Sequence, residues 1–291
     1  MRKLLVLLAG ISICITLFGC STKPQQAQVV ATTLPVYEFA SLICSGTDIT
    51  VSQLITENVS CLHDYTLQVH QMQLLENAEL VVLSGAGLDA FIAELVDDNL
   101  CIDASKNISL LCAEAHHTHS HNHNHDDADP HIWLSPENAK QMAENIYIGL
   151  CQTYPQYTSA FADNLQQLLE QLDTLQSYGD QQLADLSSRN CITFHDGFAY
   201  LATAFDLQIL RAIEEESGSE ASAQEIIELI CLIDTHNITA IFTERNGTAS
   251  SAEILHSETD VAVYELDMAI SGTSYFDAMY HNIDTIKEAL E

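Results

Sequence analysis

Three histidines and one aspartate stand in sequence contexts that suit metal binding: His63, His131, His195 and Asp267. Imidazole nitrogens and a carboxylate oxygen are ligands that Zn²⁺ takes in a tetrahedron, with Zn–N distances of about 2.0–2.1 Å. The four residues are far apart along the chain, so only folding can bring them together. These residues therefore predict a zinc site assembled from distant segments.

A second group of histidines is crowded into residues 116–125. Its members are His116, His117, His119, His121, His123 and His125. Histidines that alternate with small polar residues cannot form a core, so we expect a loop. Several imidazoles close together favour auxiliary capture of Zn²⁺, Ni²⁺ or Cu²⁺. The alternative is a passive low-complexity linker.

Strands and helices alternate along the rest of the chain. Expected strands occupy residues 29–33, 48–55, 80–84, 191–194, 207–210, 240–243 and 261–264. Expected helices occupy residues 36–45, 67–77, 91–98, 137–151, 157–186, 197–205, 222–236, 251–258 and 276–290. This order predicts an α/β fold with mainly parallel sheets flanked by helices.

The alternation is interrupted once, which predicts two lobes. Residues 156–188 are polar with leucines at helical spacing, and they read as one long linking helix. We therefore expect an N-terminal α/β lobe over 29–155 and a C-terminal α/β lobe over 189–291.

The predicted elements place the four candidate ligands at comparable positions. His63, His195 and Asp267 follow expected strands, and His131 directly precedes an expected helix. Open parallel sheets bind ligands outside the carboxyl ends of their strands. Because each lobe supplies two of the four residues, a cleft between the lobes is the expected location of the site.

The chain is strongly acidic. It has 41 acidic and 9 basic residues among 291, for a formal net charge of -32. Phosphate binding needs clustered Lys and Arg, so nucleic acid is excluded as a partner. Hydrophobic residues make up 47% of the chain, which is ample material for a core.

The N-terminus predicts export. Arg2 and Lys3 precede an apolar run over residues 4–18, which is too short for a membrane-spanning helix of roughly 20 residues. The run ends at Cys20 in a phrase that resembles the bacterial lipoprotein cleavage box. We expect residues 1–19 to be a signal peptide, Cys20 to carry the lipid and residues 20–28 to form a tether. An ordinary signal peptide with a coincidental cysteine is the alternative.

The phrases around the candidate ligands resemble those of solute-binding protein family 9, the metal-binding components of bacterial zinc and manganese ABC importers. The phrase Asp129-Pro-His-Ile-Trp-Leu134 is the most specific. Further matches are Gly85-Ala-Gly87, Asp103-Ala-Ser105 and Glu215-Glu-Ser-Gly-Ser219. The resemblance covers residues 29–290 and implies two α/β lobes, a long rigid linking helix and a metal held in the cleft between the lobes. We expect a monomer, anchored on the extracytoplasmic side by the lipid on Cys20, that passes the metal to a permease. The resemblance also implies that His63, His131, His195 and Asp267 are the ligands.

This chain departs from the family pattern at two ligands. Leu62 stands where a proline usually precedes the first histidine, and Asp267 runs into Met268 rather than proline. Glu265 or a water molecule is therefore an alternative fourth ligand.

An imidazole at His195 favours zinc, because manganese members of the family tend to have a carboxylate there and Mn²⁺ prefers oxygen ligands. Three other functions stay open. One is a manganese-binding relative, and another is a surface adhesin or metal buffer with the same lobes. The third is a zinc hydrolase, in which Asp64 or Asp196 would be the base. Pairing among the seven cysteines after Cys20 is also left open.

Overall fold

The computed structural model describes residues 29–59, 62, 65–112, 128–214, 221–245 and 250–291. The expectations for the signal peptide, Cys20, the tether, His63, Asp64 and the histidine-rich segment 116–125 lie outside the described residues. Within them, no helix is long and apolar enough to cross a membrane.

The N-terminal lobe is built on one parallel sheet with the strand order β2-β1-β3-β4. Its strands are β1 (Val29–Ala31), β2 (Val51–Gln53), β3 (Leu80–Leu83) and β4 (Cys101–Asp103). Its helices are α2 (Leu34–Ile43), α3 (Val69–Glu76) and α4 (Pro136–Thr153). All three residues of β1 are buried, which explains why this strand is entirely apolar.

The C-terminal lobe repeats the arrangement, with the order β6-β5-β7-β8 and parallel pairing throughout. Its strands are β5 (Asn190–His195), β6 (Gln208–Glu214), β7 (Ala240–Glu244) and β8 (Ala262–Leu266). Its helices are α6 (Ala199–Ala204), α7 (Ala223–His236), α8 (Ser250–Thr259) and α9 (Tyr275–Leu290). The two four-stranded parallel sheets confirm the predicted fold class.

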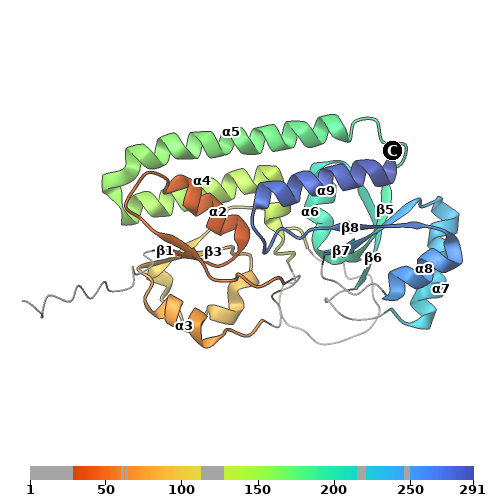
Figure 1. Ribbon diagram of the computed structural model, residues 1–291, viewed down its shortest axis with the longest axis horizontal. Coiled ribbons are helices and arrows are strands. Elements are labelled where there is room, and N and C mark those ends of the chain that lie inside the picture. Colours follow the sequence, from red (N-terminus) through yellow and green to blue (C-terminus); the bar gives the residue numbers. More distant parts are fainter. Residues whose placement is uncertain (1–28, 60–61, 63–64, 113–127, 215–220, 246–249) are drawn as a thin grey trace, which may run out of the picture.

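One long helix, α5 (Thr158–Gln182), runs from one lobe to the other (Figure 1). Its 25 residues extend roughly 38 Å. Leu168, Leu172 and Leu175 are fully buried along one face, as their helical spacing predicts. The linking helix is therefore anchored along its length.

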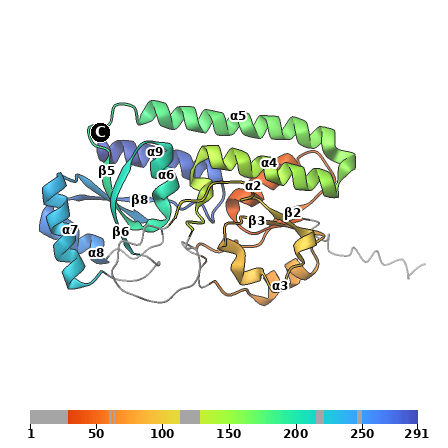
Figure 2. The ribbon, with the colours of Figure 1, turned by 180° about the vertical axis from the view of Figure 1, so that it is seen from behind.

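A second helix, α9, also crosses the boundary between the lobes, which the sequence did not indicate. It packs against both α5 and α2 (Figure 2). The carboxylate of Glu38 on α2 accepts hydrogen bonds from the backbone N–H of Tyr275 and the hydroxyl of Ser274 at the start of α9. The Tyr275 hydroxyl donates to the carbonyl of Trp133 at 2.8 Å. These contacts fasten the two lobes directly to each other.

The predicted helix over 91–98 was wrong. The structure has two short 3₁₀ turns there, Leu88–Ile92 and Asp98–Leu100. The Asp97 side chain accepts a hydrogen bond from the Asn99 backbone N–H, a local bond that competes with α-helix formation. Strand β4 follows at once, and its three residues are too few for an alternating pattern to reveal.

Candidate metal site

His131 is held in place by the residue two positions before it. Its ring is buried, and its Nδ1 lies 2.8 Å from Oδ1 of Asp129, which also accepts the His131 backbone N–H at 2.9 Å. An ionised carboxylate oxygen can only accept, so Nδ1 is the donor, and in the neutral imidazole this tautomer makes Nε2 the acceptor. Asp129 thus orients the ring in the way that carboxylates orient metal-binding histidines.

His195 is the last residue of β5, and its ring is also buried. Strand β5 lies between β6 and β7, where the strand order reverses, which is the place at which open parallel sheets bind ligands. The site is therefore built on one of the most central strands of the C-terminal sheet.

The two rings present the same nitrogen to each other. Nε2 of His195 lies 3.4 Å from Nε2 of His131, and the ring planes are nearly perpendicular at 88°. Two nitrogens bound to one tetrahedral Zn²⁺ lie roughly 3.3–3.4 Å apart. The spacing permits a hydrogen bond between the rings, and it also matches the separation of two nitrogens that share one metal ion.

Close packing fixes this pair. A side chain at Gly197 would put its Cβ 2.7 Å from both Nδ1 of His131 and Cε of Met268, so only glycine fits. The Trp133 ring packs edge-on against His131, and its Nε1 donates to the Met268 carbonyl at 2.8 Å. The chain following β8 is therefore tied to the histidine-bearing segment of the other lobe.

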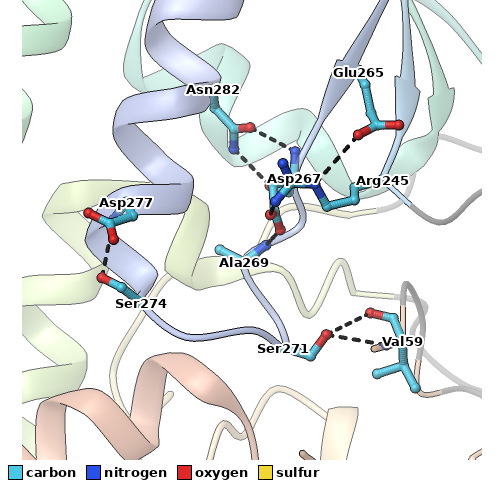
Figure 3. Close-up of polar contacts among 9 residues, drawn as sticks. All are labelled: Val59, Arg245, Glu265, Asp267, Ala269, Ser271, Ser274, Asp277 and Asn282. Carbon is cyan, nitrogen blue, oxygen red and sulfur yellow. Dashed lines mark hydrogen bonds and ion pairs between the residues drawn. The ribbon is translucent and has the colours of Figure 1, made fainter. Parts of the chain in front are cut away.

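Asp267 follows β8 directly, and both its backbone and its carboxylate make hydrogen bonds (Figure 3). Its backbone N–H donates to Asn282 Oδ1 at 2.7 Å, and Asn282 Nδ2 donates back to its carbonyl at 2.7 Å. In its carboxylate, Oδ1 accepts the Ala269 N–H and Oδ2 lies 2.8 Å from Nη1 of Arg245. The aspartate is thus positioned firmly, with its charge already paired.

The structure brings together two of the four predicted ligands, His131 and His195. Asp267 stands at the end of β8 in an ion pair, and His63 lies outside the described residues. Among the residues that are described, no group of three or more His, Cys, Asp or Glu side chains is arranged to hold a metal ion. The complete ligand set remains a prediction.

Sequence reasoning missed several residues that position the site. Asp129 and Gly197 lie within phrases already noted, but nothing in the sequence assigned them to orienting or to close packing. Arg245 and Asn282 gave no local signal, because each acts across the fold on Asp267.

None of the cysteines that the structure describes belongs to a group of side chains that could hold a metal ion. The six described ones are free thiols: Cys44, Cys101, Cys112, Cys151, Cys191 and Cys231. Burial raises the pKa of the Cys44 and Cys191 thiols to about 12, so neither is ionised near neutral pH. The apolar sequences around Cys44 and Cys231 predict a small buried hydrophobic residue at each position; this is confirmed for Cys44 and wrong for Cys231, which is exposed.

Comparison with known proteins decides the family. The family model described as zinc-uptake complex component A, periplasmic, matches residues 29–289. The chain belongs to this family. Its members are solute-binding components of ABC importers and not enzymes, which confirms the predicted class and removes the hydrolase alternative.

Individual relatives agree with this assignment. The zinc-binding lipoprotein AdcA of Streptococcus pneumoniae (strain ATCC BAA-255 / R6) is 26% identical over 312 residues, covering 100% of this chain and 62% of AdcA. The zinc-binding protein TroA of Treponema pallidum (strain Nichols) is 26% identical over 246 residues, 78% of each chain. A crystal structure of ZnuA superposes with a TM-score of 0.80 at 29% identity, covering 91% of this chain and 100% of that one. The chain therefore spans less than two thirds of AdcA.

Proposed function

We propose that this protein captures Zn²⁺ between its two lobes and delivers it to the permease of an ABC importer. The observation that supports the proposal most strongly is the histidine pair. Both Nε2 atoms are buried, they lie 3.4 Å apart, and one ring is oriented by Asp129. Building such a pair costs desolvation of two imidazoles, a cost that a metal ion offsets.

The full site in this proposal consists of His63, His131, His195 and Asp267. His63 would enter from the N-terminal lobe, and Asp267 would enter from the end of β8. Zinc is favoured over manganese because the two described histidines offer nitrogen, whereas Mn²⁺ prefers oxygen ligands. The histidine-rich segment 116–125 would raise the local metal concentration before capture.

The location and the partner also belong to the proposal. A lipid on Cys20 would anchor a monomeric protein on the extracytoplasmic side of the membrane, where the permease is accessible. The AdcA relative is named a lipoprotein, which supports the anchor. Metal-loaded protein would dock on the permease and release the ion.

Metal analysis of protein purified without added metal tests the site. We expect one tightly held Zn²⁺ per wild-type chain. In titrations against a chelator, the affinity of this site should be reduced roughly 100-fold in His195→Ala and His131→Ala, because each removes a ligand. His281→Ala changes an exposed histidine on α9 and should bind like wild type. Equal zinc affinity in wild type and His195→Ala would contradict the proposed site.

Growth under zinc chelation separates an importer from a surface adhesin or a metal buffer with the same lobes. A strain lacking the gene should grow poorly in chelator and recover with added zinc. Normal zinc accumulation in that strain would remove the import role while leaving zinc binding intact.

A further inference from the structure

We propose that Arg245 sets the metal affinity of the site and its preference for zinc over manganese, by holding the carboxylate of Asp267 in an ion pair. The inference rests on the proposed function, in which Asp267 is the carboxylate ligand. Arg245 is not itself a proposed ligand, but it controls how readily the Asp267 carboxylate can bind the metal.

The position of Arg245 follows from the pairing of β7 with β8. Glu244 and Leu266 are register partners, and the Arg245 N–H extends this pairing by donating to the Leu266 carbonyl at 2.8 Å. Side chains alternate along a strand, so Glu265 and Asp267 project from the same face on either side of Leu266. The Arg245 side chain therefore lies between two carboxylates (Figure 3).

The guanidinium contacts both acids. Nη1 of Arg245 lies 2.8 Å from Oδ2 of Asp267, and Nε lies 3.5 Å from Oε1 of Glu265. The Asp267 side chain is only 13% exposed, whereas that of Arg245 is 50% exposed. The shorter, less exposed contact is the stronger one, because water screens it less.

This pair competes with any cation that approaches Asp267. Both carboxylate oxygens are already engaged, one by Arg245 and the other by the Ala269 N–H. A guanidinium keeps its charge at every pH that the protein meets, so it cannot leave by deprotonation. A metal ion must share or displace the guanidinium to coordinate Asp267.

The competition penalises the two metals unequally. Zn²⁺ can be held by imidazoles such as His131 and His195 even when the carboxylate is partly neutralised. Mn²⁺ depends more on oxygen ligands, so it loses more when Asp267 is paired. The ion pair would therefore act as a filter that favours zinc.

Competition titrations of Zn²⁺ and Mn²⁺ against a chromophoric chelator, on the full mature chain, test the proposal. In Arg245→Gln we expect the Mn²⁺ dissociation constant to fall by about tenfold and the Zn²⁺ dissociation constant to fall less. The ratio of the Mn²⁺ constant to the Zn²⁺ constant should therefore decrease by about threefold or more. Arg245→Lys keeps the charge and should stay near wild type. Arg211→Gln is the matched control, because it removes an arginine that pairs with Glu228 on α7 at 3.6 Å.

The Asp267→Asn background tells whether Arg245 acts through Asp267. Repulsion between the guanidinium and the ion is common to both divalent metals and cancels in the ratio. We therefore expect Arg245→Gln to leave the ratio unchanged once Asp267 is replaced, which is a coupling that a double-mutant cycle measures.

Two results would overturn the inference: a ratio that moves by less than about threefold in Arg245→Gln, or an equal change with and without Asp267. Circular dichroism of each variant establishes that it is folded. If wild type itself binds no Zn²⁺, the proposed function fails. If wild type binds Zn²⁺ and Arg245→Gln changes nothing, only the role of Arg245 fails.

Discussion

Individual carboxylates in this protein have different roles, which depend on their burial and hydrogen-bond partners. Asp129 is buried and orients His131, while Asp267 is paired with Arg245. Asp89 is buried in the N-terminal lobe, where its Oδ2 accepts the Gly85 N–H at 2.7 Å. Of the 41 acidic residues, the sequence singled out Asp267 as a ligand. It could not single out Asp129 or Asp89, because burial and hydrogen bonding are properties of the fold.

Asp89 should make stability depend on pH. Burial raises the pKa of its carboxyl from 3.8 to about 6, against the opposing effect of hydrogen bonds from Thr32 and Gly85. An acid with a raised pKa in the folded state stabilises the protein below its unfolded pKa, and that stability is lost as pH rises through the folded value. Relative to Asp89→Asn, wild type should lose about 2 kcal/mol of unfolding free energy between pH 4 and pH 7, since at pH 4 the unfolded carboxyl is already partly ionised. Urea titrations at several pH values measure the difference in unfolding free energy between wild type and Asp89→Asn. A difference that does not change with pH would contradict a raised pKa for Asp89.

At the scale of elements, the sequence predicted the helices and strands that have a clear hydrophobic pattern. It missed the short elements and the contacts that depend on tertiary packing. The leucines of α5 and the apolar run of β1 are visible in the sequence, because burial selects residue type there. The three-residue strand β4 and the short 3₁₀ turns at Leu88–Ile92 and Asp98–Leu100 are too short to show a periodic pattern. The role of α9 was also hidden. Its contacts with Glu38 and Trp133 join segments more than 140 residues apart.

Helices α7 and α8 of the C-terminal lobe should be locally less stable than α9 and the linking helix α5. Helix α7 buries only Ile226, Leu229 and Ile233, and it packs with α8 around a small separate apolar cluster. Helices α5 and α9 belong instead to the large cluster that spans both lobes. Because local opening follows the amount of buried apolar contact, amides of α7 and α8 should exchange with deuterium faster than those of α5 and α9. Equal protection across the four helices in hydrogen-exchange mass spectrometry would contradict this ordering.

At the scale of the whole molecule, two lobes share one core. The main apolar cluster includes Val29 at the first strand, Trp133 near the site and Leu290 at the end of α9. The sequence predicted the two sheets and the linking helix from local patterns. It did not indicate that the lobes are fused, because that depends on contacts such as those between the Leu34 N–H and the Ile270 carbonyl. Fused lobes favour a site that is largely preformed over one that assembles by wide closure.

The shared core predicts that both lobes unfold together. If the lobes were independent, each would melt at its own temperature. Because the main cluster and the Trp133–Met268 and Trp133–Tyr275 hydrogen bonds cross the boundary, disrupting one lobe exposes the apolar surface of the other. We expect a single calorimetric transition whose van't Hoff and calorimetric enthalpies agree, and which zinc moves upward as a whole. Trp133→Phe removes the hydrogen bond to Met268 while keeping most of the apolar volume, so it should lower the midpoint without splitting the transition. Two resolved transitions in the wild-type protein would show that the lobes are energetically separate, and a preformed site would then need another explanation.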